Sequence, residues 1–394
     1  MVLLVPDTSE IDLTRPDSTV RGAGELDDAR LGVRVHPLHA FTPDGTPLGT
    51  VWAEILNRTA GASHAARAEK EWAKKHTPIE EKESLRWLTG FQRAREVAAR
   101  LPRVGCVCVA DSEADIYEVF AEPRGALDVL IRACQDRALE LGAGGHLRDA
   151  VSAEPVLYTA ALSIRGRAAK IAAETRGRRQ NREGRRTAVE VRAATVTVRA
   201  PWRFDRVLPP VTLNVVLVRE SAPPPGEVRV EWILLTTLPI GTGEQVRTIV
   251  DYCSVRWSIE ILFRTLKSGC RIEDRRFEHI DRVLPCLALY LIVAWRTLFV
   301  CRLSRECPDV ACGAVFEPSE WKAVWVAVKK KEPPKEPPRL AEMVHLIARL
   351  GGYIERPASE PGPQTVWIGL QRMYDLAWAW DTFGPGAKLN EKDM

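Results

Sequence analysis

The stretch Val104-Gly105-Cys106-Val107-Cys108-Val109-Ala110-Asp111 is a continuous apolar run that ends in a carboxylate. A strand with only apolar side chains is typical of the centre of a sheet that is covered on both faces, because neither side of it meets water. We therefore expect a buried central strand over 104–110, with Asp111 at its carboxyl end. In α/β proteins, ligands bind at this edge of the sheet.

The segments before this run predict the rest of a sheet core. A second short apolar run, Val2–Val5, is followed closely by Asp7. Residues 31–40 and 48–56 alternate like half-buried strands on either side of a turn, which predicts a hairpin. Residues 78–101 carry apolar side chains at helical spacing, so a helix should connect the hairpin to the central strand.

Ser112 is positioned to cap a helix over 113–122, and residues 128–133 have the composition of another buried strand. The element order is then strand, hairpin, helix, strand, helix, strand. This order indicates an α/β fold with a mixed sheet flanked by helices, and it matches that of a ribonuclease H-like core.

Residues 150–237 change character and predict an inserted antiparallel β subdomain, with short alternating runs at 156–164, 187–198, 211–218 and 228–236. Between 164 and 203, twelve Lys or Arg face three Glu, with Arg178 and Arg179 at the centre of the densest part. Such a run is usually a solvated hairpin tip. A local excess of nine on a chain with a net charge of +4 nevertheless favours contact with a polyanion.

Further helices are expected over 244–268, 283–303, 340–350 and 366–383. We therefore predict five segments: the first part of the core at 1–149, the β subdomain at 150–237, the completion of the core at 238–328, a Pro/Lys-rich linker at 329–339 and a C-terminal helical unit at 340–394.

Composition excludes several classes of protein. With 45% apolar and 27% charged residues over 394 positions, the chain is not globally disordered. No signal peptide is visible, and the most apolar stretch, Val283–Trp295, has thirteen residues, which favours a buried helix over a bilayer span. Nine cysteines at irregular spacing match no zinc motif. We expect free thiols in a reducing, bacterial cytoplasm, and a nucleoid-associated protein there.

Three carboxylates are the candidate catalytic residues. Asp7 and Asp111 each follow a strand, and Glu260 lies on the helix predicted over 244–268. Oxygen ligands from separate elements suit Mg²⁺ or Mn²⁺, and two such ions can drive an in-line phosphoryl displacement. The alternative is that each acid is a cap or a surface carboxylate.

Arg256, Glu260 and Lys267 would share nearly one face of that helix, because they are spaced by four and seven residues. An ion-paired solvent face is one explanation. A metal ligand between two phosphate-binding cations is the other, and it fits better a helix that is otherwise so apolar.

The segment Arg256-Trp257-Ser258-Ile259-Glu260, with Lys267 after six more residues, resembles the signature of DDE transposases of the insertion-sequence-four family. That signature is Tyr, two residues, Arg, three residues, Glu, six residues, Lys. Residues 109–118 and 5–10 look like the family's second-Asp and first-Asp motifs. Residues 347–353 and the Trp367–Trp380 helix resemble the C-terminal dimerisation unit of the transposon-five type.

This resemblance implies a cut-and-paste DNA transposase with a ribonuclease H-like fold. Asp7, Asp111 and Glu260 would bind two Mg²⁺, for which Mn²⁺ could substitute. Water and then the freed 3′-hydroxyl would attack phosphodiesters, with a DNA hairpin intermediate in the closest relatives. The partners would be double-stranded DNA, at the transposon ends and the target, and a second copy of the chain once DNA is bound.

The resemblance also implies DNA contacts. Arg256 and Lys267 would hold phosphates near the cleaved end, and Trp232 matches the family residue that stacks on a flipped base. A core position in a strand is an equal alternative for Trp232. Arg132 and Arg137 match DNA-contacting positions, with a sheet-edge surface role as the competing interpretation.

Two features depart from the family pattern. Tyr252 precedes Arg256 by four residues instead of three, and Cys253 takes the matching position. On a regular helix Tyr252 would point about 100° from the expected face, unless a local bulge restores it. The chain also begins six residues before Asp7, so we expect it to lack the N-terminal end-binding domain.

Three functions are therefore open. The first is a DDE transposase that cleaves transposon ends and transfers strands. The second is a non-catalytic inhibitor or truncated relic that pairs with a longer transposase. The third is a stand-alone metal-dependent nuclease.

Overall fold

The computed structural model describes residues 1–58, 76–140, 145–164, 166, 183–356 and 359–385. Arg178 and Arg179, and with them the centre of the predicted basic hairpin, lie outside the described residues. The chain divides into two compact units, one of Met1–Asp7 with Ala65–Arg256 and the other of Thr8–His64 with Trp257–Met394. The five predicted segment boundaries stay predictions.

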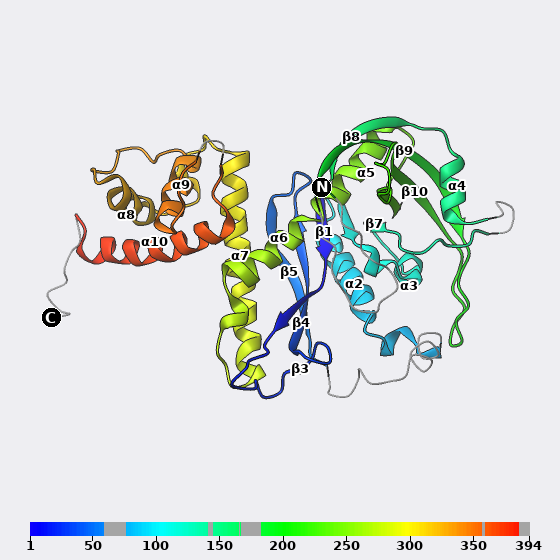
Figure 1. The fold of residues 1–394 in the computed structure, drawn as a ribbon, viewed down its shortest axis with the longest axis horizontal. Helices are drawn as coiled ribbons and strands as arrows, with labels where there is room; N and C mark the ends of the chain where they lie inside the picture. The colour runs from blue at the N-terminus through cyan, green and yellow to red at the C-terminus, as the bar shows by residue number, and fades with distance from the viewer. Residues whose placement is uncertain (59–75, 141–144, 165, 167–182, 357–358, 386–394) are drawn as a thin grey trace. The chain divides into compact units, whose positions relative to one another are not determined.

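The first unit contains a mixed sheet in the order β1-β6-β7-β11-β10-β9-β8 (Figure 1). Its parallel part is β1 (Val2–Pro6), β6 (Cys106–Ala110) and β7 (Leu127–Arg132). The antiparallel part is β11 (Glu231–Thr236), β10 (Val211–Glu220), β9 (Arg185–Val198) and β8 (Tyr158–Ile164). Every residue of β6 is buried, as its composition predicted.

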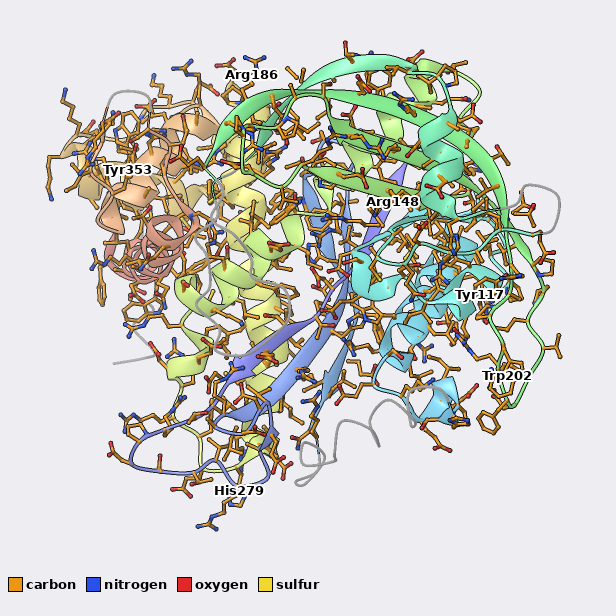
Figure 2. All side chains as sticks on the ribbon, turned by 45° about the vertical axis from the view of Figure 1, so that its right-hand side comes forward. Tyr117, Arg148, Arg186, Trp202, His279 and Tyr353 are labelled. Atoms are coloured by element: carbon orange, nitrogen blue, oxygen red, sulfur yellow. The ribbon has the colours of Figure 1, made fainter. Side chains whose placement is uncertain are left out.

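The antiparallel strands extend the parallel ones, because β11 pairs directly with β7. The four strands predicted between 150 and 237 are therefore confirmed. Tyr117, labelled in Figure 2, ties them to the core, because its hydroxyl donates to the carbonyl oxygens of Val198 at 3.2 Å and Pro209 at 2.8 Å.

Helices cover the parallel strands of this unit. Helix α2 (Leu85–Ala99) packs on β1, β6 and β7, and α5 (Gly243–Val255) packs on β6 and β7. A capping box between Thr242 and Gln245 begins α5. The remaining helices of the unit are short: the 3-10 turn Ile79–Glu81, α3 (Tyr117–Ala121) and α4 (Leu147–Ala153).

The helix predicted over 113–122 is wrong in its start and its cap. Asp111, and not Ser112, is the N-cap, and it begins only a 3-10 turn over Ser112–Ala114, with α3 starting at Tyr117. The cause is Asp115, which turns inward at 2% exposure and accepts the backbone N–H groups of Cys134 and Gln135. The Asp115 backbone carbonyl oxygen also accepts from Arg137 Nη2 at 2.8 Å, so that both its side chain and its carbonyl are bound by the segment after β7.

In the second unit, β4 (Leu31–Phe41) pairs antiparallel with β2 (Ser9–Asp12), β3 (Gly24–Glu25) and β5 (Pro47–Leu56). The predicted hairpin is thus confirmed. Helix α7 (Ile280–Glu306) packs on β5, where the Trp295 indole N–H donates to the Pro47 carbonyl oxygen at 3.0 Å.

Helix α7 extends well beyond the predicted 283–303. Its most apolar window has a mean hydropathy of 2.0, and 39% of that window is buried. By length and composition alone it could cross a membrane. This is weak evidence, because the core helix of a soluble protein meets the same criteria.

Three helices form the C-terminal part: α8 (Pro318–Lys329), α9 (Leu340–Leu350) and α10 (Pro363–Phe383). Helices α9 and α10 were predicted, whereas α8 was not. All three share one core with α7. The largest of its buried side chains are Phe316, Trp321, Met343, Leu346, Leu370 and Met373.

Helices α9 and α10 cross at glycines. A Cβ on Gly369 would lie 1.9 Å from the Ile347 carbonyl oxygen, and one on Gly351 would lie 1.9 Å from that of Thr365. Real Cβ atoms do not approach a backbone oxygen so closely, so the helices could cross at this distance only without these side-chain atoms.

We predict that Gly369→Ala lowers the free energy of unfolding by at least about 2 kcal/mol, because the added methyl forces the two helices apart. Gly362→Ala is the control, because nothing lies within 4 Å of its Cβ position. Urea denaturation measures both. Equal stability of the two variants would contradict the crossing.

Glu220 at the end of β10 is a buried carboxylate whose pKa falls from its ordinary 4.5 to about 2, chiefly because Arg185 donates two hydrogen bonds to it, each at 3.0 Å. The Val230 backbone N–H donates a third, also at 3.0 Å. The side chain is fully buried. The pair joins the start of β9 to the end of β10.

Because this pKa is depressed in the folded state, its contribution to stability is present above pH 4.5 and is lost as the pH falls from 4.5 toward 2. We predict that Glu220→Gln flattens the pH dependence of the melting temperature in that window. The exposed Glu96→Gln should leave it unchanged. Parallel profiles for wild type and Glu220→Gln would show that the pair contributes nothing.

Candidate active site

Asp7 and Asp111 follow neighbouring parallel strands. Strand β1 pairs with β6 through Val2↔Cys106, Leu3↔Val107 and Leu4↔Cys108. Asp7 follows the last residue of β1 by one position, and Asp111 directly follows β6. Both carboxylates therefore lie beyond the carboxyl ends of paired parallel strands, at the edge of the sheet where the sequence predicted a site.

Asp7 is paired with a cation. The Nη1 atom of Arg256 donates to its Oδ2 at 3.1 Å, and the two side chains are only 10% and 13% exposed. Arg256 is the C-cap of α5, which packs on β6. The α5 helix thus delivers a permanent positive charge to the first carboxylate of the pair.

Asp111 is oriented by the backbone that follows it. Its Oδ1 accepts the Glu113 N–H at 2.8 Å, as an N-cap side chain does. One carboxylate oxygen is therefore engaged in fixing the side chain at the end of β6. The Asp111 side chain therefore caps the 3-10 turn that follows it, in addition to any catalytic role.

The donor set at this edge suits a hard cation. Paired carboxylate oxygens are the ligands that Mg²⁺ and Mn²⁺ prefer, and both aspartates are only partly buried, which leaves access for water. Among the described residues, no group of three or more His, Cys, Asp or Glu is arranged to hold a metal ion. The edge therefore supplies two carboxylates, and a third must join them for a triad.

Glu260 and Lys267 belong to the second unit, and the helix predicted over 244–268 is broken. Helix α6 (Ser258–Arg264) carries Glu260 in its first turn, and a π-helix over Thr265–Gly269 carries Lys267. Lys267 lies 3.8 Å from the Glu273 carboxylate. Glu273 also accepts the Asp12 N–H at 3.0 Å.

The single face expected for Arg256, Glu260 and Lys267 is therefore wrong. The Arg256 N–H bonds to the Ser254 carbonyl oxygen and that of Glu260 to Trp257, so the regular helical ladder is interrupted between α5 and α6. The π-helix then changes the angle per residue before Lys267. The three residues keep the spacing of the sequence motif, but no single regular helix carries all three.

Tyr252 lies within α5, which is a regular helix to Val255. The bulge that could have corrected its spacing is therefore not in α5. Burial raises the pKa of Tyr252 above 10, and the charge of Asp251 adds to the effect. Its role as a DNA contact stays a prediction.

Arg137 is buried and paired within the first unit, and its role as a DNA contact stays a prediction. The residue is 9% exposed, and its guanidinium donates to the Asp115 carboxylate through Nε at 3.1 Å and Nη2 at 2.5 Å. It also stacks against the rings of Tyr117 and Phe120. Together with Asp115 it ties the loop after β7 to the loop after Asp111.

Asp115 was missed as the partner in this pair. The sequence placed it in the first turn of a helix, where its charge had a sufficient local explanation. The only available signal was a second acid shortly after Asp111 in a segment that follows a buried strand. Nothing in the chain near Asp115 indicates Arg137, because the two are 22 residues apart.

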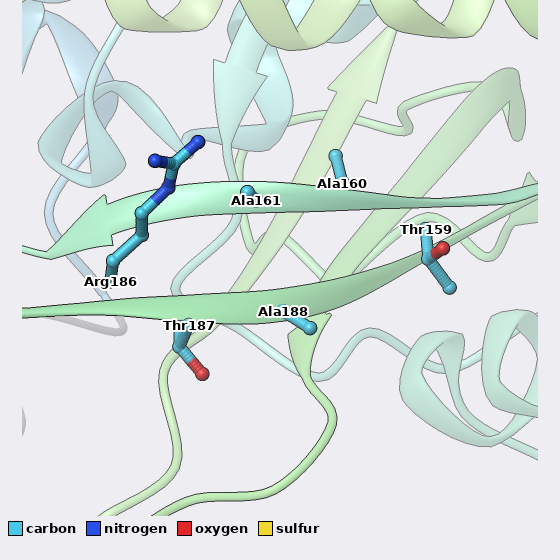
Figure 3. A pocket seen from close by; sticks show the side chains of 6 residues that line it. All are labelled: Thr159, Ala160, Ala161, Arg186, Thr187 and Ala188. Atoms are coloured by element: carbon cyan, nitrogen blue, oxygen red, sulfur yellow. The ribbon is translucent and has the colours of Figure 1, made fainter.

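Arg132 and Trp232 lie on paired strands. Arg132 ends β7, is exposed and pairs with Leu234, while half-buried Trp232 pairs with Val218 near the start of β11. Their DNA contacts remain predictions. A surface hollow of about 450 Å³ lies over β8 and β9 beside Arg186 (Figure 3), at the other end of the sheet order from β1.

Two family models match the chain. The model described as "Transposase DDE domain" matches residues 90–294, and that described as "Transposase Tn5 dimerisation domain" matches residues 292–378. The first covers more than half of the chain. The chain therefore belongs to the DDE transposase family, whose members use divalent metal ions, and its mixed sheet with helices is the ribonuclease H-like fold.

The protein is accordingly a DNA transposase, and the first of the three functions is the one that the family match supports. The DDE match includes Asp111, Arg256, Glu260 and Lys267 but begins after Asp7. The assignment of Asp7 rests on its position after β1, the strand that pairs with β6.

We predict that Arg256→Gln increases the affinity of the DNA-free protein for Mn²⁺ by about tenfold, because a metal ion must otherwise displace the guanidinium from Asp7. Isothermal titration measures this without any catalytic turnover. Arg95→Gln, which removes the half-buried pair with Glu122, should leave the affinity unchanged. Equal or weaker binding by Arg256→Gln would contradict the competition.

Proposed function

We propose that this transposase cleaves DNA at the ends of its element and joins the freed ends to target DNA by a cut-and-paste reaction. The observation that supports this most directly is that Asp7 and Asp111 follow the paired parallel strands β1 and β6, with the Arg256 guanidinium bound to Asp7. A carboxylate pair with a neighbouring arginine offers both metal ligands and a phosphate contact.

Asp7, Asp111 and Glu260 are proposed as the metal ligands, with two Mg²⁺ per site and Mn²⁺ as a substitute. When bound, such ions activate the attacking oxygen and stabilise the leaving oxygen of an in-line displacement. Asp111 is already oriented for this task by its hydrogen bond from Glu113. The inclusion of Glu260 rests on the spacing of the motif that it shares with Arg256 and Lys267.

Arg256 and Lys267 are proposed to hold phosphates at the cleaved end. In the DNA-free protein each is close to a carboxylate, Arg256 to Asp7 at 3.1 Å and Lys267 to Glu273 at 3.8 Å. DNA phosphates would bind Arg256 and Lys267 in place of these carboxylates. Asp7 would then be released for metal binding when substrate is present, so that DNA binding and metal binding are coupled.

The remaining DNA contacts are proposed from the family likeness. Trp232 would stack on a flipped base, and Arg132 and Tyr252 would contact the strand nearby. Arg178 and Arg179 would add sequence-independent affinity for the backbone.

The partners are proposed to be double-stranded DNA, at transposon ends and target, and a second copy of the chain. Helix α10 carries large side chains that are exposed in the single chain, with Tyr374 at 43%, Trp378 at 67% and Phe383 at 71%. Burial of such a row between two chains would favour a homodimer. We place the protein in the bacterial cytoplasm, at the nucleoid.

The test is a cleavage and strand-transfer assay with Mg²⁺ on duplexes that carry the element's own ends. Asp111→Asn and Glu260→Gln should each lower the rate at least about 10³-fold, because each removes a charge that holds the metal. Asparagine keeps the cap at residue 111, so loss of folding is not the cause.

Glu96→Gln serves as the control, because Glu96 is an exposed acid on α2 that pairs with Arg93. Cleavage without strand transfer would instead indicate a nuclease. No cleavage by the wild type, together with tight association with a longer transposase, would indicate an inhibitor. Either result would overturn the proposal.

A further inference from the structure

A cavity of about 100 Å³ in the second unit lies between α6, α7, the β4–β5 turn and the start of α10. Its polar wall consists of Ser258 at the start of α6 and of Arg302 and Arg305 on α7. Gly45 and Pro363 contribute the turn and the first residue of α10. Two arginine residues therefore line one small recess.

One N–H group of Arg302 has no hydrogen-bond acceptor among the described residues. This N–H group is that of Nε, which is buried. The other end of the guanidinium is held, because Nη2 donates to the Asp44 carbonyl oxygen and lies 3.1 Å from the Glu306 carboxylate. A buried N–H without an acceptor is costly and rare, so the Arg302 guanidinium has a donor still to be satisfied beside the cavity.

The electrostatics of the recess favour an anion. Arg305 adds a second permanent charge three residues from Arg302, an arrangement that is unfavourable on a helix unless something between the charges offsets it. Its Nη2 donates to the Pro361 carbonyl oxygen at 3.0 Å, which holds the side chain in place. The positive end of the α10 dipole points to the same wall at Pro363. Two acids lie near this cluster: Glu306, which is 40% exposed and pairs with Arg302, and Asp44, whose pKa is lowered chiefly by side-chain hydrogen bonds and also by the charge of Arg302.

We propose that this cavity binds a phosphate group, with Arg302 and Arg305 as its charge partners and the Ser258 hydroxyl as a neutral donor. Guanidinium groups match the geometry of phosphate oxygens, and a recess of this size admits a single tetrahedral oxyanion. The phosphate is either a backbone phosphodiester of bound DNA or free inorganic phosphate. Only the first source rests on the proposed function.

The anion site is tested by thermal unfolding of the full chain in sodium phosphate and in sodium chloride of equal ionic strength. The melting temperature of the wild type should be higher in phosphate by about 2 °C or more. Arg302→Gln and Arg305→Gln should lose this increment. Arg282→Gln, an exposed arginine on the same helix, should keep it.

Arg302→Lys tests whether a lost phosphate increment is caused by misfolding, because this variant keeps the positive charge but lacks Nε. It should unfold cooperatively in chloride and show a reduced phosphate increment. No increment in the wild type, or a full increment in Arg302→Gln, would overturn the proposal.

The source of the phosphate is tested with Asp111→Asn as the background, so that cleavage plays no part. If DNA supplies the phosphate, adding Arg302→Gln lowers the slope of log affinity for duplex DNA against log salt by about one. An unchanged slope with a lost phosphate increment would assign the site to free phosphate and overturn the DNA source. A failure of the proposed transposition chemistry would leave the thermal readout unaffected.

Discussion

The parallel pairing of β1 with β6 is the constraint on which the candidate site depends. It joins the first strand of the chain to one that starts about a hundred residues later, and the two strands lead to Asp7 and Asp111 at the same edge of the sheet. Two like charges at that edge would repel each other. The Arg256 guanidinium, with 10% of its side chain exposed, offsets this repulsion at a distance of 3.1 Å from Asp7. The sheet edge therefore positions the two aspartates, and the end of α5 supplies the positive charge that offsets their repulsion.

Arginine–carboxylate pairs recur at the points where distant segments of the first unit meet. Asp115 and Arg137 join the loops after β6 and β7, and Glu220 and Arg185 join two strands of the antiparallel part. Removing one member of such a pair leaves a buried charge without a partner, which is costly. The Asp7–Arg256 pair differs because Asp7 is also a proposed metal ligand. We therefore expect bound DNA to separate this pair.

Much of the fold could be predicted from the sequence, because its signals are local. The apolar run over 104–110 and the alternation over 31–56 produced the expected strands. Helix α9 was predicted to the residue from its amphipathic pattern. Helix α8 was missed, although Pro318 at its first position and the Glu317–Glu320 capping box are local signals that were available.

The errors share a cause, which is pairing over long distances in sequence. The break between α5 and α6 has no glycine or proline to indicate it, and it falls where Arg256 is held by Asp7, 249 residues away. Asp115 left the predicted helix because it binds the loop after β7. At the site, the positions of Asp7 and Asp111 after buried strands were predictable, because each strand is a local apolar run. The shared helical face of Arg256, Glu260 and Lys267 was not.

We propose that Asp7 and Asp111 bind one metal ion jointly after Arg256 is displaced. Anomalous diffraction from crystals of the chain bound to duplex DNA and Mn²⁺ tests this. We expect a peak about 2.0–2.3 Å from a carboxylate oxygen of each aspartate, with the Arg256 guanidinium moved from Asp7 to a DNA phosphate. A metal ion held by Asp111 alone, with Arg256 still paired to Asp7, would contradict it.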